Sequence, residues 1–207
     1  MSTVMEISTS TPFLTGNFNG QSVKLRQITV EEYDLMIEKG VFDENDQVEL
    51  LNGGIVEKMP KGKNHANYND IAADLFKEKL GKKVWVRNQN PIWLDDFSEP
   101  EPDLALVEPP FNKYFNSHPI PEEIYLLVEV SDSTLGYDRN TKAEAYSRAG
   151  IRQYIVLNVQ EKTIEDYREP GADGFQSKQT HRAGDNFNLV IFPQISFEVN
   201  EFFPSDL

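Results

Sequence analysis

Two acidic residues stand at the edges of otherwise apolar segments of this sequence. Asp103 opens the segment DLALV, and Glu129 lies near the end of IYLLVEV. Segments of this composition are typical of buried β-strands, where an unpaired carboxylate is costly. A hard cation such as Mg²⁺ or Mn²⁺ would offset that cost, because it takes carboxylate oxygens and can be shared with a substrate phosphate. The pair is therefore a candidate metal site, although Asp103 could instead be a loop-capping acid at the entry of a strand.

A lysine follows Glu129 at a position that could complete a hydrolytic site. A helix is expected over residues 138–149, capped by Asp138. Four of its residues share one face: Lys142, Ala145, Tyr146 and Ala149. On an inward face, Lys142 could orient an attacking water and stabilise negative charge on a phosphate. It could equally form a structural ion pair with Glu129, without any catalytic role.

The elements that must position these residues alternate between strands and helices. Five short segments rich in β-branched and aromatic residues predict strands: KVWVRNQ, PIWL, DLALVE, IYLLVEV and QYIVLNV. IYLLVEV is the most continuously apolar, which is typical of a central strand buried on both faces. With the helix over 138–149 and QYIVLNV, it makes a strand, helix, strand unit.

The flanking regions carry further turn and capping signals. Thr29 and Glu32 form a capping box before a helix, and Asn52-Gly53 is the preferred pair for a type I′ hairpin turn. Helical spacing of apolar residues predicts another helix over 64–80. Four segments after residue 162 alternate as strands do: TIEDYREP, FQSKQTHR, FNLVIF and ISFEV. These patterns predict an α/β fold, with a mixed sheet flanked by helices and extra strands at the C-terminus.

Composition limits the class of protein. A chain of 207 residues with 39% hydrophobic content suits one core, so we expect one domain over 28–207, preceded by an arm over 1–27. The sequence has no apolar run of about 18 residues and no signal peptide, which predicts a soluble cytoplasmic protein without membrane contact. The absence of cysteine excludes disulfides, thiolate metal sites and cysteine nucleophiles. The net charge of −14 counts against a strongly basic nucleic-acid surface.

Four stretches together resemble a known bacterial family. They are VELLNGGIVEKMPKGKNHA, RNQNPIWL, EPEPDLALV and LLVEVSDSTLGYDRNTKAEAYSRAGIRQYIVLN. They are similar to the putative restriction endonucleases of the PD-(D/E)XK nuclease superfamily, and the similarity extends from Thr29 to the C-terminus. The resemblance implies a restriction-endonuclease-like fold, a Mg²⁺-dependent or Mn²⁺-dependent endonuclease activity on DNA, and a homodimer.

The resemblance also implies roles for the residues named above. Asp103 and Glu129 match the metal-binding acids of the superfamily, and the main-chain carbonyl of Val130 is a further expected ligand. Ser131 stands where the superfamily pattern has its lysine, which breaks the strict motif. In branches of the superfamily the lysine has moved to the following helix, and Lys142 is the matching position.

Three more residues match positions of the same family. Glu49, in the first hairpin, is a candidate extra metal ligand; the alternative is a cross-strand partner on an exposed hairpin. His65 and Gln89 match positions with peripheral roles.

Three functions are consistent with these observations. The first is a metal-dependent endonuclease that hydrolyses phosphodiester bonds in DNA. The second is a catalytically inert nucleic-acid-binding or assembly module that keeps the nuclease fold, which the charge of −14 favours. The third is a carboxylate–metal hydrolase for small phosphodiesters, which would use the same site but would not cleave polynucleotides. Metal binding separates the inert module from the two hydrolases.

Overall fold

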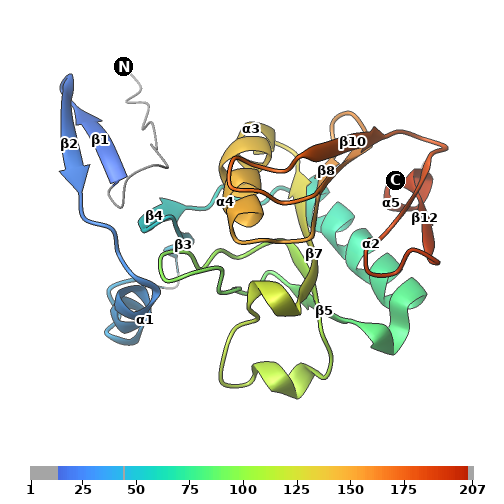
Figure 1. Cartoon of the computed structure of the whole chain (residues 1–207), viewed down its shortest axis with the longest axis horizontal. Helices are drawn as coiled ribbons and strands as arrows, with labels where there is room; N and C mark the ends of the chain where they lie inside the picture. Colours follow the sequence, from blue (N-terminus) through green and yellow to red (C-terminus); the bar gives the residue numbers. More distant parts are fainter. Residues whose placement is uncertain (1–13, 44, 205–207) are drawn as a thin grey trace. The chain divides into compact units, whose positions relative to one another are not determined.

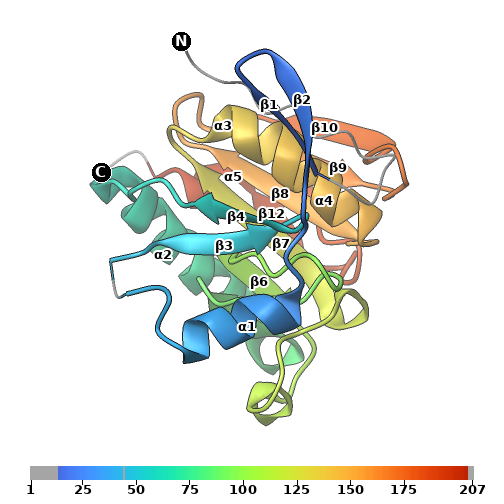
Figure 2. The ribbon, with the colours of Figure 1, turned by 90° about the vertical axis from the view of Figure 1, so that its left-hand side faces the viewer.

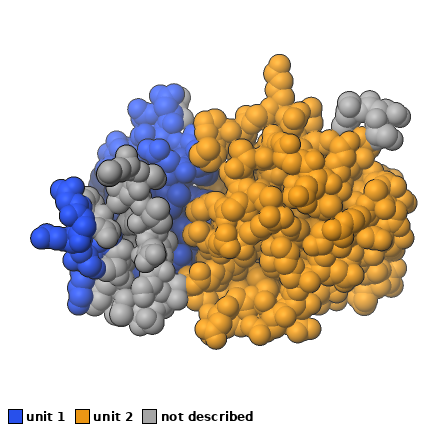
Figure 3. All heavy atoms as spheres, turned by 90° about the horizontal axis from the view of Figure 1, so that it is seen from above, with its two compact units in different colours: residues 1–58, 94–100 blue, residues 59–93, 101–207 orange. Residues whose placement is uncertain are grey.

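The computed structural model describes residues 14–43 and 45–204. The chain divides into two compact units (Figure 3). The first unit comprises residues 1–58 and 94–100, and the second comprises residues 59–93 and 101–207. Among the helices of the described residues, none is both long and apolar enough to cross a membrane.

The first unit contains two hairpins and a helix. Its elements are β1 (Leu14–Phe18), β2 (Gln21–Leu25), α1 (Val30–Glu38), β3 (Val48–Leu51) and β4 (Gly54–Glu57). The predicted capping box is confirmed, since Thr29 and Glu32 each accept a hydrogen bond from the other's main-chain amide. The predicted turn is confirmed too, because Asn52 and Gly53 both have positive φ angles, as a type I′ turn requires.

The expected arm over residues 1–27 contains a hairpin that the sequence patterns did not predict. Strands β1 and β2 pair in antiparallel fashion around Asn19 and Gly20, which both have positive φ angles. The flanking segments LTGNF and QSVKL are five residues long and contain two large apolar residues each, which is a weak strand signal. Residues 1–13 of the expected arm lie outside the described residues.

The second unit is built on a six-stranded mixed sheet, which confirms the predicted fold class (Figure 1). The strands are β5 (Trp85–Asn88), β6 (Leu104–Val107), β7 (Ile124–Ser131), β8 (Gln153–Asn158), β9 (Thr163–Arg168) and β10 (Ser177–His181). Their order across the sheet is β10-β9-β8-β7-β6-β5. Only the β7–β8 pair is parallel, as the predicted strand, helix, strand unit requires.

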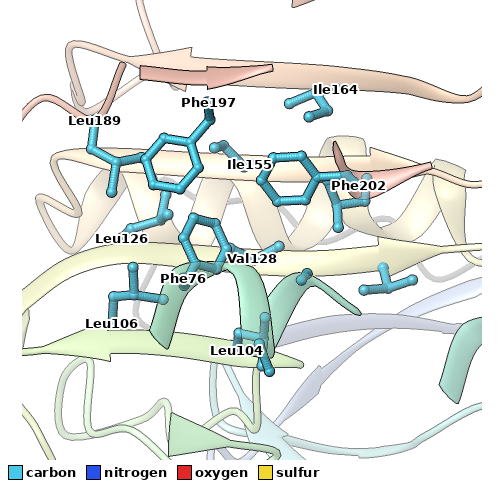
Figure 4. Close-up of a cluster of buried hydrophobic side chains, with 14 of the residues drawn as sticks. Phe76, Leu104, Leu106, Leu126, Val128, Ile155, Ile164, Leu189, Phe197 and Phe202 are labelled. Atoms are coloured by element: carbon cyan, nitrogen blue, oxygen red, sulfur yellow. The ribbon is translucent and has the colours of Figure 1, made fainter. Parts of the chain in front are cut away.

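Helices cover both faces of this sheet (Figures 1 and 2). One face packs on α2 (Lys63–Leu80) and on the C-terminal elements β11 (Asn186–Asn188), β12 (Ser196–Glu198) and α5 (Val199–Phe202). Their contact is the main hydrophobic core, in which Phe76 of α2 touches the rings of Phe197 and Phe202 (Figure 4). The other face carries the helical segment that follows β7. Short 3₁₀ turns complete the unit: η1 (Gly81–Lys83), η2 (Phe111–Tyr114) and η3 (Pro121–Glu123).

The helix expected over 138–149 begins earlier than predicted. Helical structure starts with α3 (Leu135–Tyr137), continues through the π-helical turn η4 (Asp138–Lys142) and ends with α4 (Ala143–Arg148). Asp138 is therefore inside the helix and not its cap, because the carbonyl of Thr134 already accepts the amide hydrogen bonds of the first turn. π-Helical turns are rare and are frequent at functional sites.

One predicted strand is absent. Residues 91–94, the segment PIWL, join no strand of the sheet. Pro91 has no amide hydrogen to donate, and the amide of Trp93 donates to the carbonyl of Pro119 instead. Apolar content alone did not distinguish this packed loop from a strand.

Candidate active site

The register of β6 and β7 brings Asp103 next to Glu129. Leu104 pairs with Val128, so Asp103, which directly precedes β6, lies beside the following residue of β7. The amide of Asp103 lies 3.4 Å from Glu129 Oε2, and the amide of Val130 donates to Asp103 Oδ2 at 2.9 Å. Both carboxylates are buried. The structure therefore joins the two acids that the sequence singled out.

Glu129 points away from the main core and toward the helix that follows β7. Its neighbours Val128 and Val130 pack in the core with α2, and alternation along a strand sends Glu129 to the opposite face. There Lys142 Nζ donates to Glu129 Oε1 at 2.9 Å, and the hydroxyl of Tyr146 donates to the same oxygen at 2.8 Å. Lys142 is thus buried on the inward face, as its helical spacing predicted.

The first turn of α2 and the loop before it supply the partners of Asp103 on the other side. His65 Nε2 lies 2.9 Å from Asp103 Oδ2, and Lys61 Nζ lies 3.5 Å from Oδ1. His65 Nδ1 is buried and has no hydrogen-bond partner in the part of the chain that the structure describes. His65 therefore contacts one of the two site acids, whereas the sequence predicted only a peripheral role for it.

The remaining predicted side chains are Gln89, in the second unit, and Glu49, in the first. Gln89 follows β5 with a positive φ, and its amide donates to the carbonyl of Asp103 at 3.0 Å. Glu49 belongs to β3 of the first unit, where it pairs with Val56 and is buried. Glu49 is thus not the exposed cross-strand partner considered above. Metal-ligand roles for Glu49 and for the Val130 carbonyl stay predictions.

A third buried acid, Asp138, was not identified from the sequence as a site residue. Its carboxylate accepts a hydrogen bond from the hydroxyl of Thr134 at 2.6 Å. Asp138, Lys142 and Tyr146 follow one another at intervals of four residues, which places all three on one helix face. That spacing was the available signal, and it was missed because Asp138 was interpreted as a helix cap. Lys61 lies in a loop and carried no comparable signal.

Burial and charge shift the acids in opposite directions. Burial raises the pKa of Asp103, but the hydrogen bond and charge of His65 and the amide of Val130 outweigh it and hold this pKa below its usual value. The pKa of Glu129 is raised well above its usual value, first by burial and then by repulsion from Asp103 and Asp138, against the attraction of Lys142. Burial also raises the pKa of Asp138. An added positive charge would therefore reduce the electrostatic repulsion between these buried carboxylates.

An ion pair fixes the helix of Lys142 to the sheet. Arg139, on η4, donates through Nε to both oxygens of Glu165 on β9 at 3.0 Å. Lys178 and Tyr167 complete the set, at 2.9 Å and 2.8 Å from Glu165 Oε2. Arg139 and Lys142 both belong to η4.

Glu165 gives a testable acid dependence of stability. Burial raises its pKa, but hydrogen bonds from Arg139, Lys178 and Tyr167 outweigh burial and lower the pKa to about 2. Stability from this group is present above pH 4.5, and it is lost as the pH falls toward 2. We expect Glu165→Gln to lower the free energy of unfolding above pH 4.5 by at most about 3 kcal/mol and to remove its decrease toward pH 2. Urea unfolding across that window checks it, and equal pH slopes for both proteins would contradict it.

The donor chemistry fits a hard cation. Mg²⁺ prefers carboxylate oxygens and is commonly bound by only one or two of them, with water and substrate phosphate in the other positions. Within residues 14–43 and 45–204, no group of three or more His, Asp or Glu side chains is placed to hold a metal ion. The site thus offers the Asp103–Glu129 pair and no complete side-chain cage. The raised pKa of Glu129 is the observation that favours a cation there.

Comparison with known families bears on the identity of this site. The model of the Uma2 family, described as putative restriction endonuclease, matches residues 30–200. The chain belongs to the Uma2 family. The match confirms the resemblance drawn from the sequence motifs. The matched range includes the candidate site residues Asp103, Glu129 and Lys142.

Known structures show the same fold. The crystal structure of a putative nuclease belonging to DUF820, from Anabaena variabilis, superposes with a TM-score of 0.63. The two chains are 14% identical, and the alignment covers 85% of this Uma2 chain and 97% of the other. No curated protein matches the sequence. The restriction-endonuclease-like fold of this Uma2 member is therefore supported by both a family model and a solved structure.

Proposed function

We propose that this protein is a metal-dependent nuclease that hydrolyses phosphodiester bonds in DNA. The observation that carries the proposal is the buried Asp103–Glu129 pair with Lys142 bound to Glu129. Membership of the Uma2 family supports the reaction class. The fold of the Anabaena variabilis structure, whose title describes a putative nuclease, is consistent with it.

The residues divide into two groups by what they can do. Asp103 and Glu129, with the Val130 carbonyl, would hold Mg²⁺ or Mn²⁺, which when bound polarises a phosphate and lowers the pKa of an attacking water. Lys142 contacts Glu129, and its amine can stabilise the negative charge that develops on the phosphate during hydrolysis. Tyr146 fixes the orientation of the Glu129 carboxylate through its hydroxyl. Lys61 and His65 place positive charge or N–H donors beside Asp103.

Metal binding can be tested without any substrate. We expect Mg²⁺ or Mn²⁺ to raise the unfolding temperature of the wild-type protein, because a ligand that binds only the folded state stabilises it, by about 2.7 kcal/mol at one hundred times its dissociation constant. Asp103→Asn should abolish this stabilisation while the metal-free protein stays folded. Differential scanning calorimetry in EDTA and in each metal measures the effect, and equal metal-induced shifts in both proteins would count against the proposed ligand.

One observation favours a second candidate, the inert binding or assembly module. Protein donors already occupy the acid pair, since Lys142 and Tyr146 bind Glu129 Oε1 while His65 and the Val130 amide bind Asp103 Oδ2. Such contacts could hold a relic site together without metal. Calorimetry distinguishes the nuclease from the inert module. If millimolar Mg²⁺ or Mn²⁺ does not change the unfolding temperature of the wild-type protein, the inert module is favoured.

A further inference from the structure

Three aromatic side chains form an exposed cluster at the β5 edge of the sheet. Trp85 of β5, Phe111 of η2 and Phe115 are 43%, 52% and 75% exposed. The Trp85 and Phe111 ring centroids lie 5.2 Å apart, and those of Phe111 and Phe115 lie 5.9 Å apart. We call these three residues the aromatic edge. Large aromatic side chains are usually well buried, so an exposed cluster marks an interaction surface.

The aromatic edge lies on the same sheet face toward which Glu129 points. Trp85 pairs with Val107 of β6, and paired residues on neighbouring strands point to the same face. Val84 and Val86, on either side of Trp85, pack in or against the main core with Val128, so Trp85 faces the other side. This is the face on which Lys142 contacts Glu129.

Strand β5 connects the aromatic edge to the acid pair. Residue 89, directly after β5, donates its amide to the carbonyl of Asp103, and Trp85 is at the other end of the strand. Four residues of β-strand rise about 13 Å, a length of roughly four nucleotides in a stacked strand at 3.4 Å each. A polynucleotide bound at the acid pair could therefore reach the aromatic edge with bases a few positions away.

The charge of the chain decides which form of nucleic acid suits this surface. Duplex binding depends mainly on many Lys and Arg contacts to phosphates, whereas this protein has a net charge of −14. Stacking on aromatic rings needs exposed base faces, which an intact duplex hides and a single strand presents. Near the aromatic edge, Lys82 and Lys83 are exposed, enough for a few phosphate contacts beside stacked bases.

We propose that the aromatic edge binds unpaired bases of single-stranded nucleic acid and directs the strand toward the acid pair. The inference rests on the proposed nuclease function and narrows its substrate class to single-stranded or frayed nucleic acid. A second copy of this chain is the alternative occupant of the three exposed rings. It remains an outcome of the test.

Binding is measured on the full chain in EDTA, so that no cleavage contributes. Anisotropy of a fluorescein-labelled oligothymidylate reports affinity, and quenching of tryptophan emission in a Trp93→Phe background reports stacking on Trp85, because the chain has two tryptophans. Trp85→Ala and Phe111→Ala should each weaken binding roughly tenfold. Trp85→Phe should keep most of the affinity and Trp85→Leu should lose it, which separates stacking from general hydrophobic contact. Val190→Ala, at a 43% exposed site outside the cluster, is the matched control.

Salt dependence gives an independent measure. With only Lys82 and Lys83 on phosphates, the slope of log affinity against log salt should be about −1.4 for a single strand. A duplex of the same sequence should compete weakly. A steep slope with strong duplex competition would overturn the proposal, because it would indicate a phosphate-binding surface.

The other outcomes also decide the matter. Oligothymidylate binding that Trp85→Ala and Phe111→Ala leave unchanged, or no binding by the wild-type protein, overturns the role of the aromatic edge. So does a dimer in sedimentation velocity that Phe115→Ala dissociates. None of these results touches the nuclease proposal, since Mg²⁺-dependent cleavage of duplex DNA that requires Glu129 would stand on its own.

Discussion

Glu129→Gln is expected to lower the rate of metal-dependent DNA cleavage at least 100-fold, while the protein remains folded. The amide keeps an oxygen that can accept hydrogen bonds from Lys142 and Tyr146, which both bind Glu129 Oε1 in the wild-type protein. It removes the negative charge that would hold a divalent cation next to Asp103. Losses of two to three orders of magnitude are typical when one group that stabilises charge in the transition state is removed. Relaxation of supercoiled plasmid in Mg²⁺ or Mn²⁺ measures the rate.

Glu165→Gln is the matched control for this prediction. Glu165 is also a buried acid of the same sheet, bound by Arg139, Lys178 and Tyr167. Loss of its charge should lower stability above pH 4.5, where the wild-type carboxylate contributes, and change cleavage only a few-fold. A Glu129→Gln protein that cleaves at the wild-type rate, or a Glu165→Gln protein that is equally inactive, would remove Glu129 from the proposed mechanism.

The acid pair could be predicted from the sequence for a local reason. An acid inside a continuously apolar segment such as IYLLVEV must be buried, because the strand has no exposed face on which to place it. Helical periodicity likewise placed Lys142 inward, since the positions of one helix face depend only on sequence spacing. Both predictions need no knowledge of what packs against the element. The structure confirms burial of Glu129 and Lys142.

The contacts between distant segments could not be predicted in the same way. Lys61 lies in a loop, and only the packing of the α2 start against β6 brings its amine to Asp103. Asp138 was misassigned because an acid at a helix start and an acid one turn inside it look alike in sequence. Asp138 lies in the π-helical turn η4 and is buried. Residue types thus identified the chemistry, and tertiary packing determined the partners.

Lys142→Met is expected to destabilise the folded protein by about 3–5 kcal/mol at neutral pH, because it leaves Glu129 buried without its countercharge. The ion pair of Lys142 with Glu129 is buried on both sides. Lys79→Met is the matched control, since Lys79 pairs with Glu201 at a partly exposed site. Exposed pairs of this kind contribute about 0–1 kcal/mol. Urea unfolding in metal-free buffer measures both variants.

The pH dependence of Lys142→Met tests the physical cause. Burial already raises the pKa of Glu129, and Lys142 opposes this, so removing the lysine raises it further. A carboxylate whose pKa is higher in the folded state is penalised increasingly as the pH rises from its unfolded value of 4.5 through its folded value. The two proteins should therefore have similar stability near pH 4.5, and the variant should become less stable than the wild type once the pH exceeds the folded pKa of Glu129 in the wild-type protein. A loss of stability independent of pH would refute an uncompensated Glu129 charge as its cause.

The same variant separates the two roles considered for Lys142. In Glu129→Gln/Lys142→Met no charge is left unpaired, so stability at neutral pH should recover by most of the loss seen in Lys142→Met. If Lys142 is only structural, Lys142→Met should cleave DNA at nearly the wild-type rate under conditions where it is fully folded. We expect the rate to stay at least 100-fold lower, because the lysine amine also stabilises charge on the phosphate. Recovery of stability together with loss of cleavage would therefore assign Lys142 to the reaction itself.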